Sequence, residues 1–131
     1  MKPEERDALL AQPLDAIVAV NRRARAPQLT PVWFYWDGAA FYLSTTRDRT
    51  KYTTITRDPL ISLIVNDQAA QHYITAYGRA EIVEGDAERV LALTMPIMEK
   101  YAPGQYITTT ASLAEQGRVV IVLRPERIVS R

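Results

Sequence analysis

The clearest pattern in the chain is the alternation of apolar and polar positions from residue 73 to residue 82. Small or apolar residues occupy every second position, while tyrosine, threonine, arginine and glutamate occupy the others. Successive side chains of a β-strand point to opposite faces of the sheet. The spacing therefore predicts one long strand over residues 72–83, with one buried face and one polar face.

Shorter apolar runs predict further strands. They cover residues 16–20, 28–36, 39–45, 60–65 and 119–128, the last of them bent near Pro125. Asp37-Gly38 lies between two of these runs, and this dipeptide is typical of a tight hairpin turn. Together with residues 72–83, the pattern predicts six strands.

Helical segments are expected between the strands. They are residues 3–11, a short helix that ends near residue 57, and a helix that begins after Asp86 and carries apolar residues at helical spacing. Asp58-Pro59 ends the second helix, because the residue before proline avoids helical geometry. Pro96 should kink or split the third. Residues 101–116 give no clear pattern.

The order of these elements indicates an α+β, mainly β protein, built as a β-barrel with helical crossovers rather than a doubly wound sheet. The length of 131 residues fits a single domain over residues 1–131, and the hydrophobic share of 47% is enough for a core. The charged start of the chain has no apolar stretch behind it, so we expect neither a signal peptide nor a membrane span, and a cytoplasmic protein.

Composition narrows the possible chemistry. Sixteen Lys and Arg residues face fifteen Asp and Glu residues, a net charge of +1, which argues against a nucleic-acid-binding protein. The absence of cysteine excludes disulfides and thiol nucleophiles, and His72 is the one histidine, so no histidine metal cluster is possible. We assign no metal site and no catalytic residue. If the protein is an enzyme, a bound cofactor brings the reactivity.

The most informative segment is the basic run from Arg47 to Lys51, between a strand end and a helix start. It holds the cations of Arg47, Arg49 and Lys51 and lies beside the hydroxyls of Thr46 and Thr50. The first N–H groups of a helix have no internal partner, and together with such cations they suit a phosphate. An ordinary solvated turn is the alternative interpretation.

Two features concern the run from residue 28 to residue 36. Pro31 cannot donate to a sheet, so it belongs at an edge or a bulge, where the backbone could meet a flat heterocycle or simply face solvent. In the aromatic run Trp33–Trp36, alternate residues must lie on opposite faces. One pair should line the barrel, and an exposed pair would suggest a dimer surface.

These segments together resemble the pyridoxamine-phosphate-oxidase-like flavin-binding split barrels, and most closely the branch that uses coenzyme F420. The matching pieces, within about residues 14–129, are Gln28-Leu29-Thr30-Pro31-Val32-Trp33-Phe34, Trp36-Asp37-Gly38, Leu43-Ser44-Thr45-Thr46 with Arg49-Thr50-Lys51, Arg57-Asp58-Pro59 and Gly78-Arg79-Ala80-Glu81. The resemblance implies a six-stranded antiparallel split β-barrel with short flanking helices.

The resemblance also implies a homodimer with a cofactor site at each side of the subunit interface. The cofactor-binding residues it suggests are Gln28, Thr30, Pro31 and Val32 beside the ring, Thr45 and Thr46 flanking it, Arg47, Arg49, Thr50 and Lys51 at the phosphate with Tyr52 nearby, and Tyr73 from the other subunit. The cofactor would be F420, with FMN as the alternative.

Three functions remain open at this point. The first is an F420-dependent reductase that transfers hydride to an unsaturated small molecule, or an FMN-dependent oxidoreductase in its place. The second is a non-catalytic flavin or deazaflavin carrier, favoured by the lack of an obvious acid–base residue. The third is a single-stranded nucleic-acid binder using exposed aromatics with Arg22, Arg23 and Arg25, against which the net charge counts. These arginines could instead contact an acidic coenzyme tail or lie on the surface.

Overall fold

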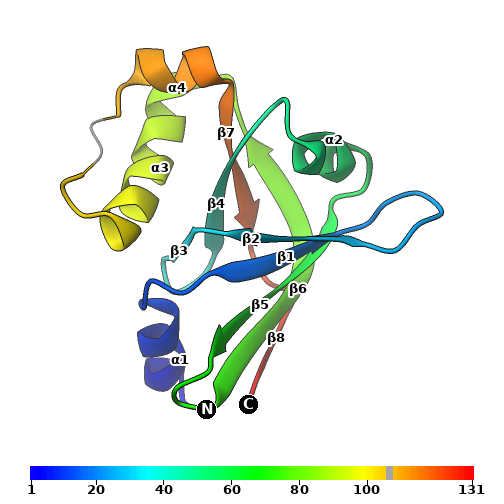
Figure 1. Ribbon diagram of the computed structural model, residues 1–131, viewed down its shortest axis with the longest axis vertical. Helices are drawn as coiled ribbons and strands as arrows, with labels where there is room; N and C mark the ends of the chain where they lie inside the picture. The colour runs from blue at the N-terminus through cyan, green and yellow to red at the C-terminus, as the bar shows by residue number, and fades with distance from the viewer. Residues whose placement is uncertain (106–107) are drawn as a thin grey trace.

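A computed structural model describes residues 1–105 and 108–131. The elements, in chain order, are α1 (Pro3–Leu10), β1 (Ala16–Val20), β2 (Gln28–Val32), β3 (Phe34–Trp36), β4 (Phe41–Thr46), α2 (Thr50–Arg57), β5 (Leu60–Asp67), β6 (His72–Val83), α3 (Ala87–Tyr101), α4 (Thr110–Gln116), β7 (Arg118–Leu123) and β8 (Arg127–Ser130). The mainly β architecture expected from the sequence is confirmed (Figure 1).

The strands form one antiparallel sheet in the order β2-β1-β5-β6-β7-β4-β3, with β8 beside β6. The long strand β6 joins the two halves of the sheet. Its first part pairs with β5 and β8, and its last four residues, from Ala80 to Val83, pair with β7. The prediction of one strand over residues 72–83 is confirmed, and this strand organises the barrel.

Residues 1–105 and 108–131 contain eight strands, so the prediction of six is wrong. The expected strand over residues 28–36 is interrupted at Trp33, since β2 pairs with β1 whereas β3 pairs with β4. The expected strand over residues 119–128 is interrupted after Leu123, since β7 pairs with the end of β6 and β8 with its beginning. Each apolar run looks continuous in the sequence because both of its parts are packed, but the two parts belong to different halves of the sheet.

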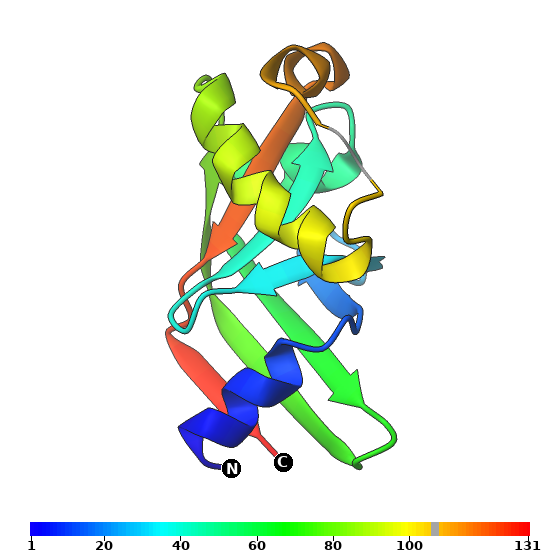
Figure 2. The same ribbon diagram turned by 90° about the vertical axis from the view of Figure 1, so that its left-hand side faces the viewer.

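The core fills the barrel and continues under the helices. The interior cluster includes Phe34, Phe41 and Ile121, all fully buried. A second cluster, including Val90, Leu113 and Val122, lies between the sheet and the helices α3 and α4. Figure 2 shows α3 lying across this face of the molecule. Because both of its faces are covered, β7 is buried along almost its whole length.

The helix α3 runs without interruption through Pro96, so of the two effects expected of this proline, a kink or a split, the split does not occur. Its start is as predicted, since the Asp86 side chain accepts a hydrogen bond from the backbone N–H of Arg89. Proline removes one bond of the helix, the one to the carbonyl of Ala92, which lies at an exposed position and can be hydrated. Buried Thr94 and Ile97 on either side hold the helix against the sheet.

The stretch without a sequence pattern, residues 101–116, contains α4. The Thr109 side chain caps its first turn by accepting a hydrogen bond from the N–H of Ser112, and Gly117 ends it in the left-handed conformation at φ 69°. Residues 106 and 107 of this stretch lie outside the described residues. No helix in the described ranges is long and apolar enough to cross a membrane.

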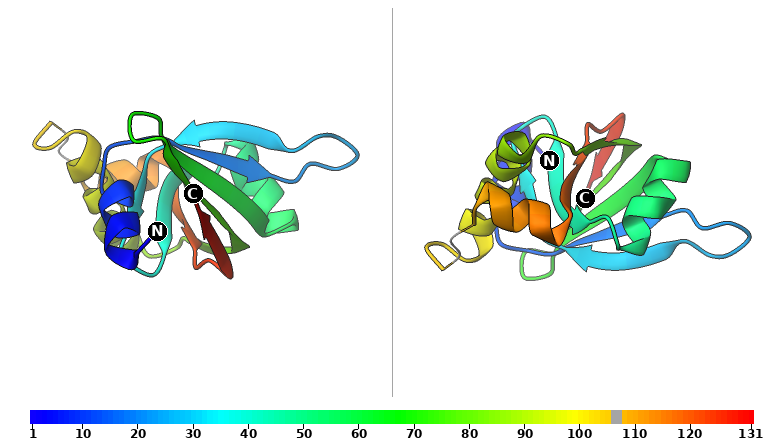
Figure 3. Two further views of the ribbon diagram at one scale, coloured as in Figure 1. Left: turned by 90° about the horizontal axis from the view of Figure 1, so that it is seen from below. Right: turned by 90° about the horizontal axis from the view of Figure 1, so that it is seen from above.

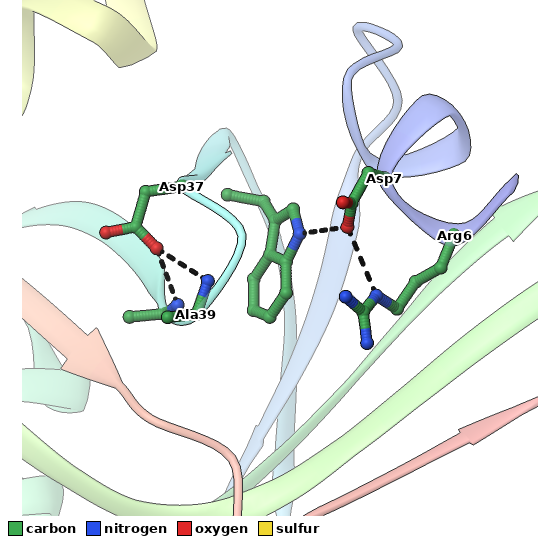
Figure 4. Close-up of polar contacts among 6 residues, drawn as sticks. Arg6, Asp7, Asp37 and Ala39 are labelled. Carbon is green, nitrogen blue, oxygen red and sulfur yellow. Dashed lines mark hydrogen bonds and ion pairs between the residues drawn. The ribbon is translucent and has the colours of Figure 1, made fainter. Parts of the chain in front are cut away.

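The N-terminal helix α1 is fastened to β3. The carboxylate of Asp7 accepts hydrogen bonds from Trp36 Nε1 at 2.8 Å and from Arg6 Nε at 3.2 Å (Figure 4). The bond from Trp36 is the main reason that the pKa of Asp7 is lowered. Next to it, Asp37 makes the predicted hairpin turn, because its Oδ1 accepts from the N–H groups of Ala39 and Ala40.

The arginine-rich loop between β1 and β2 extends from the barrel on the side opposite to α3 and α4 (Figure 3). Arg22 Nε donates a hydrogen bond to the carbonyl of Ala26 within the same loop, at 2.7 Å. Arg22 is half-buried, and Arg23 and Arg25 are exposed.

Candidate functional site

The site begins with a cavity of about 400 Å³ where the two halves of the sheet meet the helices. It is lined by Thr30, Pro31, Val32, Trp33, Ser44, Thr45, Thr46, Arg49, Lys51, Ile97, Met98 and Arg118. These residues come from the end of β2, the end of β4, the start of α2, the second half of α3 and the first residue of β7. We call this space the β2–α2 cavity.

One side of the β2–α2 cavity is cationic. Arg49, Lys51 and Arg118 line it, and no carboxylate does among the described residues. The ion pairs found within residues 1–105 and 108–131 involve none of these three cations. Burial lowers the pKa of Lys51, and the nearby Arg49 lowers it further. Cations that are brought together and partly desolvated without an acid are a favourable environment for an anion.

The N-terminus of α2 adds to this environment. The residue before the helix, Arg49, has an extended backbone at φ −82° and ψ 146°, and its side chain makes no capping hydrogen bond. Within the described residues, the N–H of Tyr52 donates to the carbonyl of Arg49 at 3.1 Å, and the N–H groups of Thr50 and Lys51 are left for a ligand or water. Asp48, just before the helix, accepts a hydrogen bond from Thr46 Oγ1 that lowers its pKa, and the charges of Arg49 and Arg118 lower that pKa further. Helix dipole and side-chain cations therefore favour the same kind of ligand, a phosphate or another compact anion.

The edge strand β2 contributes two buried polar atoms without partners. Gln28 Oε1 and Thr30 Oγ1 are both buried and accept or donate no hydrogen bond within the described part of the chain. They lie two residues apart on one face of the strand, with Val32 as the next residue on that face. Buried polar atoms are nearly always hydrogen-bonded in folded proteins. A ligand or a second chain along β2 would supply the missing bonds.

Pro31 has the edge position that the sequence predicts. The strand β2 has one neighbour, β1, so proline can occupy it without removing a bond from a second partner. The lining of the β2–α2 cavity also includes apolar side chains, among them Trp33, Ile97 and Met98. The space is thus bounded by cations and hydroxyls as well as by apolar side chains.

Trp33 is held rigidly although it is 39% exposed. Its ring stacks parallel to that of Tyr101 at 4.8 Å between centroids. The Tyr101 hydroxyl accepts a hydrogen bond from the N–H of Phe34 and donates one to the carbonyl of Leu14. The predicted alternation is confirmed, since Phe34 is fully buried while Trp33 faces outward.

The structure brings many of the predicted cofactor residues together and separates others. Lining the β2–α2 cavity are Thr30, Pro31, Val32, Thr45, Thr46, Arg49 and Lys51. Gln28 lies farther along β2, and Thr50 begins α2. Tyr73 lies at the start of β6, whose other end, at Val83, adjoins Glu84, the partner of Arg47, so within one chain Tyr73 is far from the basic run.

Arg47 and Tyr52 do not line the β2–α2 cavity. Arg47 Nε pairs with Glu84 Oε1 at 3.1 Å, and the Tyr52 hydroxyl donates to the same carboxylate at 3.0 Å. This carboxylate competes with any phosphate for both side chains. In the free protein, the basic run is therefore divided into Arg47, which is neutralised by Glu84, and Arg49 and Lys51, which face the cavity.

Sequence reasoning missed several lining residues. Ser44, Ile97, Met98 and Arg118 were not predicted, and Trp33 was considered only as an aromatic packing residue. Arg118 reaches the cavity because β7 pairs with β4 in the register that sets Arg118 opposite Thr46. Its Nη1 lies 3.5 Å from Ser44 Oγ. No local sequence signal indicates this long-range pairing.

No cluster of three or more His, Cys, Asp or Glu side chains suitable for a metal ion is found in the described ranges. The whole chain, residues 1–131, matches the family model described as pyridoxamine 5'-phosphate oxidase.

The chain belongs to the pyridoxamine 5'-phosphate oxidase family. This confirms the resemblance seen in the sequence. The fold of this family binds flavins, and the β2–α2 cavity fits such a group, with cations for a phosphate and orphaned polar atoms for the edge of a ring. A search of curated proteins finds no match.

Solved structures support the family assignment. An F420 reductase is 28% identical, with 94% of each chain covered and a TM-score of 0.76. A conserved hypothetical protein, Rv2991 from Mycobacterium tuberculosis, is 23% identical, with 99% of this chain and 84% of that chain covered and a TM-score of 0.85. A putative pyridoxamine 5'-phosphate oxidase from Listeria innocua is 19% identical, with 98% of this chain and 96% of that chain covered and a TM-score of 0.75. The last two show likeness of fold alone.

Proposed function

We propose that the protein is an oxidoreductase that binds coenzyme F420 in the β2–α2 cavity and passes hydride to an unsaturated small molecule. The observation that carries the proposal is the cavity itself, which is lined both by apolar side chains and by three cations that form no ion pair within the described residues. The choice of F420 over FMN is supported by the F420 reductase that matches 94% of this chain at 28% identity.

The residues have distinct roles in this proposal. Arg49, Lys51 and Arg118 bind the phosphate together with the first N–H groups of α2. Gln28 Oε1 and Thr30 Oγ1 bond to the polar edge of the ring and so acquire the partners that they lack. Pro31 and Val32 lie against the ring, and Thr45 and Thr46 flank it.

The chemistry divides between cofactor and protein. When bound, the reduced deazaflavin supplies a hydride, and the protein orients it and excludes water. No carboxylate or histidine lines the β2–α2 cavity in the part of the chain that the structure describes. The proton that completes the reduction therefore comes from water rather than from a dedicated acid.

A homodimer completes the proposed site. Leu29 is 66% exposed on the edge strand β2, and Leu60 and Tyr77 are also exposed. A second chain that covers these side chains would bury apolar surface beside the cavity. Tyr73, which is remote from the cavity in its own chain, is the candidate contribution of the partner.

The first experiment is a binding titration. F420 and FMN are added separately to the purified protein and followed by cofactor fluorescence. Replacing Lys51 with alanine should weaken binding of the preferred cofactor about ten- to a hundred-fold, since a charge-assisted hydrogen bond contributes roughly 1.5–3 kcal/mol. Lys2→Ala, which changes an exposed lysine at the start of α1, is the control.

The outcomes separate the candidates. Tight FMN binding without a response to F420 would assign an FMN-dependent oxidoreductase. An unchanged dissociation constant in Lys51→Ala would remove the β2–α2 cavity from cofactor binding. The lack of an acid–base residue along the cavity favours a carrier as the second candidate function. Reduced F420 that is bound but never oxidised by a panel of enones, quinones and tetrapyrroles would identify a carrier.

A further inference from the structure

A second cavity, of about 470 Å³, lies between α1, β3 and α3 and shares no residue with the β2–α2 cavity. Its wall is mainly apolar and is made by Leu10, Ala11, Tyr35, Trp36 and Pro96. Its charged residues are Glu99 and Lys100. We call it the α1–α3 cavity. Nothing in the proposed redox function uses it.

The Lys100 ammonium has an unusual environment. Its Nζ donates hydrogen bonds to the carbonyls of Leu10, at 2.8 Å, and Phe34, at 3.1 Å. It also lies 3.5 Å from the centroid of the Phe34 ring and 5.0 Å from that of Tyr101. An ammonium has three N–H donors, and these two carbonyls use two of them. The third N–H has no hydrogen-bond acceptor among the described residues, and Lys100 lines the α1–α3 cavity.

No acid of the protein neutralises this cation. The ion pairs formed among residues 1–105 and 108–131 do not include Lys100. Glu99 is exposed, and its carboxylate is not paired with the ammonium. The other titratable groups near Lys100 are Asp7 of α1, Asp15, Tyr35 of β3 and Tyr101 of α3, and Asp7 already accepts hydrogen bonds from Trp36 and Arg6. Within the described residues, Lys100 therefore carries a positive charge that no carboxylate pairs with.

We propose that the α1–α3 cavity binds an amphipathic carboxylate, whose acid group accepts the free N–H of Lys100 and whose apolar body packs against Trp36 and Pro96. One available N–H and one cation match a singly charged carboxylate. A phosphate needs several donors, and the nearby Glu99 would repel a dianion. The apolar wall excludes small hydrophilic anions as good ligands, because they would leave it unfilled.

The site has a distinctive dependence on pH. Burial lowers the pKa of Lys100 to about 8 in the unliganded protein. A bound carboxylate favours the charged ammonium and raises that pKa, so binding is linked to proton uptake. For a free pKa of about 8, the affinity should fall roughly tenfold between pH 7 and pH 9, because most Lys100 side chains are neutral at pH 9.

The test uses 4-phenylbutyrate and its neutral analogue 4-phenylbutyramide as probes. Each is titrated into the ¹⁵N-labelled protein at pH 7 and pH 9, and the indole N–H signals of Trp36 and Trp33 are followed. We expect saturable shifts of the Trp36 signal with the carboxylate, binding at least tenfold weaker with the amide, and the loss of affinity at pH 9. The Trp33 signal reports on the β2–α2 cavity and should not saturate in parallel.

Two variants keep the proposal falsifiable. Lys100→Met removes the cation, and Ala11→Phe fills the cavity while leaving the hydrogen bonds of Lys100 in place. Both should abolish carboxylate binding, whereas Lys2→Met should not change it. If Lys100→Met fails to fold, Ala11→Phe decides. Equal affinity for the acid and the amide, or unchanged binding in Ala11→Phe, would overturn the proposal without affecting the assignment of the cofactor cavity.

Discussion

At the scale of single residues, the basic run between β4 and α2 shows how neighbours in sequence take different roles. Arg49 and Lys51 face the β2–α2 cavity and have no acidic partner there, whereas Arg47 is paired with Glu84 at the end of β6. Arg118, which is distant in sequence, lines the cavity together with Arg49 and Lys51, whereas Arg47 does not. The charge available to an anion thus depends on which cations the fold has already neutralised.

This division leads to a prediction for two arginines. Arg118→Ala should weaken binding of the preferred cofactor by about tenfold or more, because it removes a charge-assisted bond to the phosphate. Arg47→Ala should change the dissociation constant by no more than about threefold, because the exposed ion pair with Glu84 contributes little. Fluorescence titration measures both. A larger loss in Arg47→Ala than in Arg118→Ala would mean that Arg47 leaves Glu84 when the ligand binds.

Among secondary-structure elements, the contact between α3 and β3 supplies hydrogen-bond partners for the backbone of an edge strand. The strand β3 is at an edge of the sheet, so its outward N–H and C=O groups have no neighbouring strand. Two consecutive residues of α3 provide partners. The Tyr101 hydroxyl accepts from the N–H of Phe34, and Lys100 Nζ donates to the carbonyl of the same residue. The last turn of α3 acts as a substitute for a missing strand.

Removing the hydroxyl of Tyr101 tests this role. Tyr101→Phe keeps the ring stacked on Trp33 but leaves the N–H of Phe34 and the carbonyl of Leu14 without their bonds. We expect a loss of about 1–3 kcal/mol in the free energy of unfolding, the usual cost of unsatisfied buried polar groups. Urea denaturation measures it. The exposed Tyr77→Phe is the matched control and should be close to neutral. Equal stability of the two variants would refute the role.

The shifted pKa values of Lys100 and Tyr101 predict how the free energy of unfolding varies with pH. The folded pKa of Lys100 is about 8, below the 10.5 of an ordinary lysine, so between these values the unfolded chain binds more protons and stability rises with pH. Burial raises the pKa of Tyr101 from 10 to about 12, so the folded chain holds a proton that the unfolded one loses, and stability falls over that range.

Urea midpoints measured from pH 7 to pH 11 check both signs. Lys100→Met should flatten the rise above pH 8, and Tyr101→Phe should flatten the fall above pH 10. The pKa of Lys51 is lowered in the same direction as that of Lys100, so part of the rise should persist in Lys100→Met. A wild-type midpoint that decreases steadily from pH 8 would contradict the assignment to Lys100.

For the molecule as a whole, the decisive position is Gly78, where β7 gives way to β8 along β6. A Cβ atom built there would lie 3.0 Å from Leu123 Cδ1, 3.2 Å from the N of Glu126 and 3.3 Å from the O of Arg124. The backbone of residues 124–126 crosses β6 at this point, and the N–H of Glu126 donates to the carbonyl of Tyr77. Glycine is required because two backbones approach each other closely.

Gly78→Ala should therefore destabilise the protein by about 1–3 kcal/mol, since the backbone of residues 124–126 must move to admit a methyl group. Thermal and urea unfolding measure the effect. Ala80→Gly, two residues later on the same face, serves as a control for the intrinsic difference between the two residues in a strand, roughly 0.5–1 kcal/mol. If Gly78→Ala proves as stable as the wild type, the close approach of residues 124–126 to Gly78 would be contradicted.

The elements themselves were largely predictable from the sequence. Alternation indicated β6, the Asp37-Gly38 dipeptide indicated the hairpin, and Asp86 indicated the start of α3. These signals succeed because side-chain periodicity and caps depend on residues a few positions apart. Local composition also singled out Pro31, Arg49 and Lys51, which the structure brings together along the β2–α2 cavity.

Tertiary structure decided what depends on pairing at long range. Whether residues 28–36 and 119–128 form one strand or two depends on which half of the sheet each part joins. The register of β4 with β7 brings Arg118 to the cavity, and the end of β6 brings Glu84 to Arg47. The hydrogen-bond register between distant strands cannot be predicted from the local pattern of apolar and polar residues. For this reason the sequence determined the elements and the region of the site, and the fold determined which side chains face it.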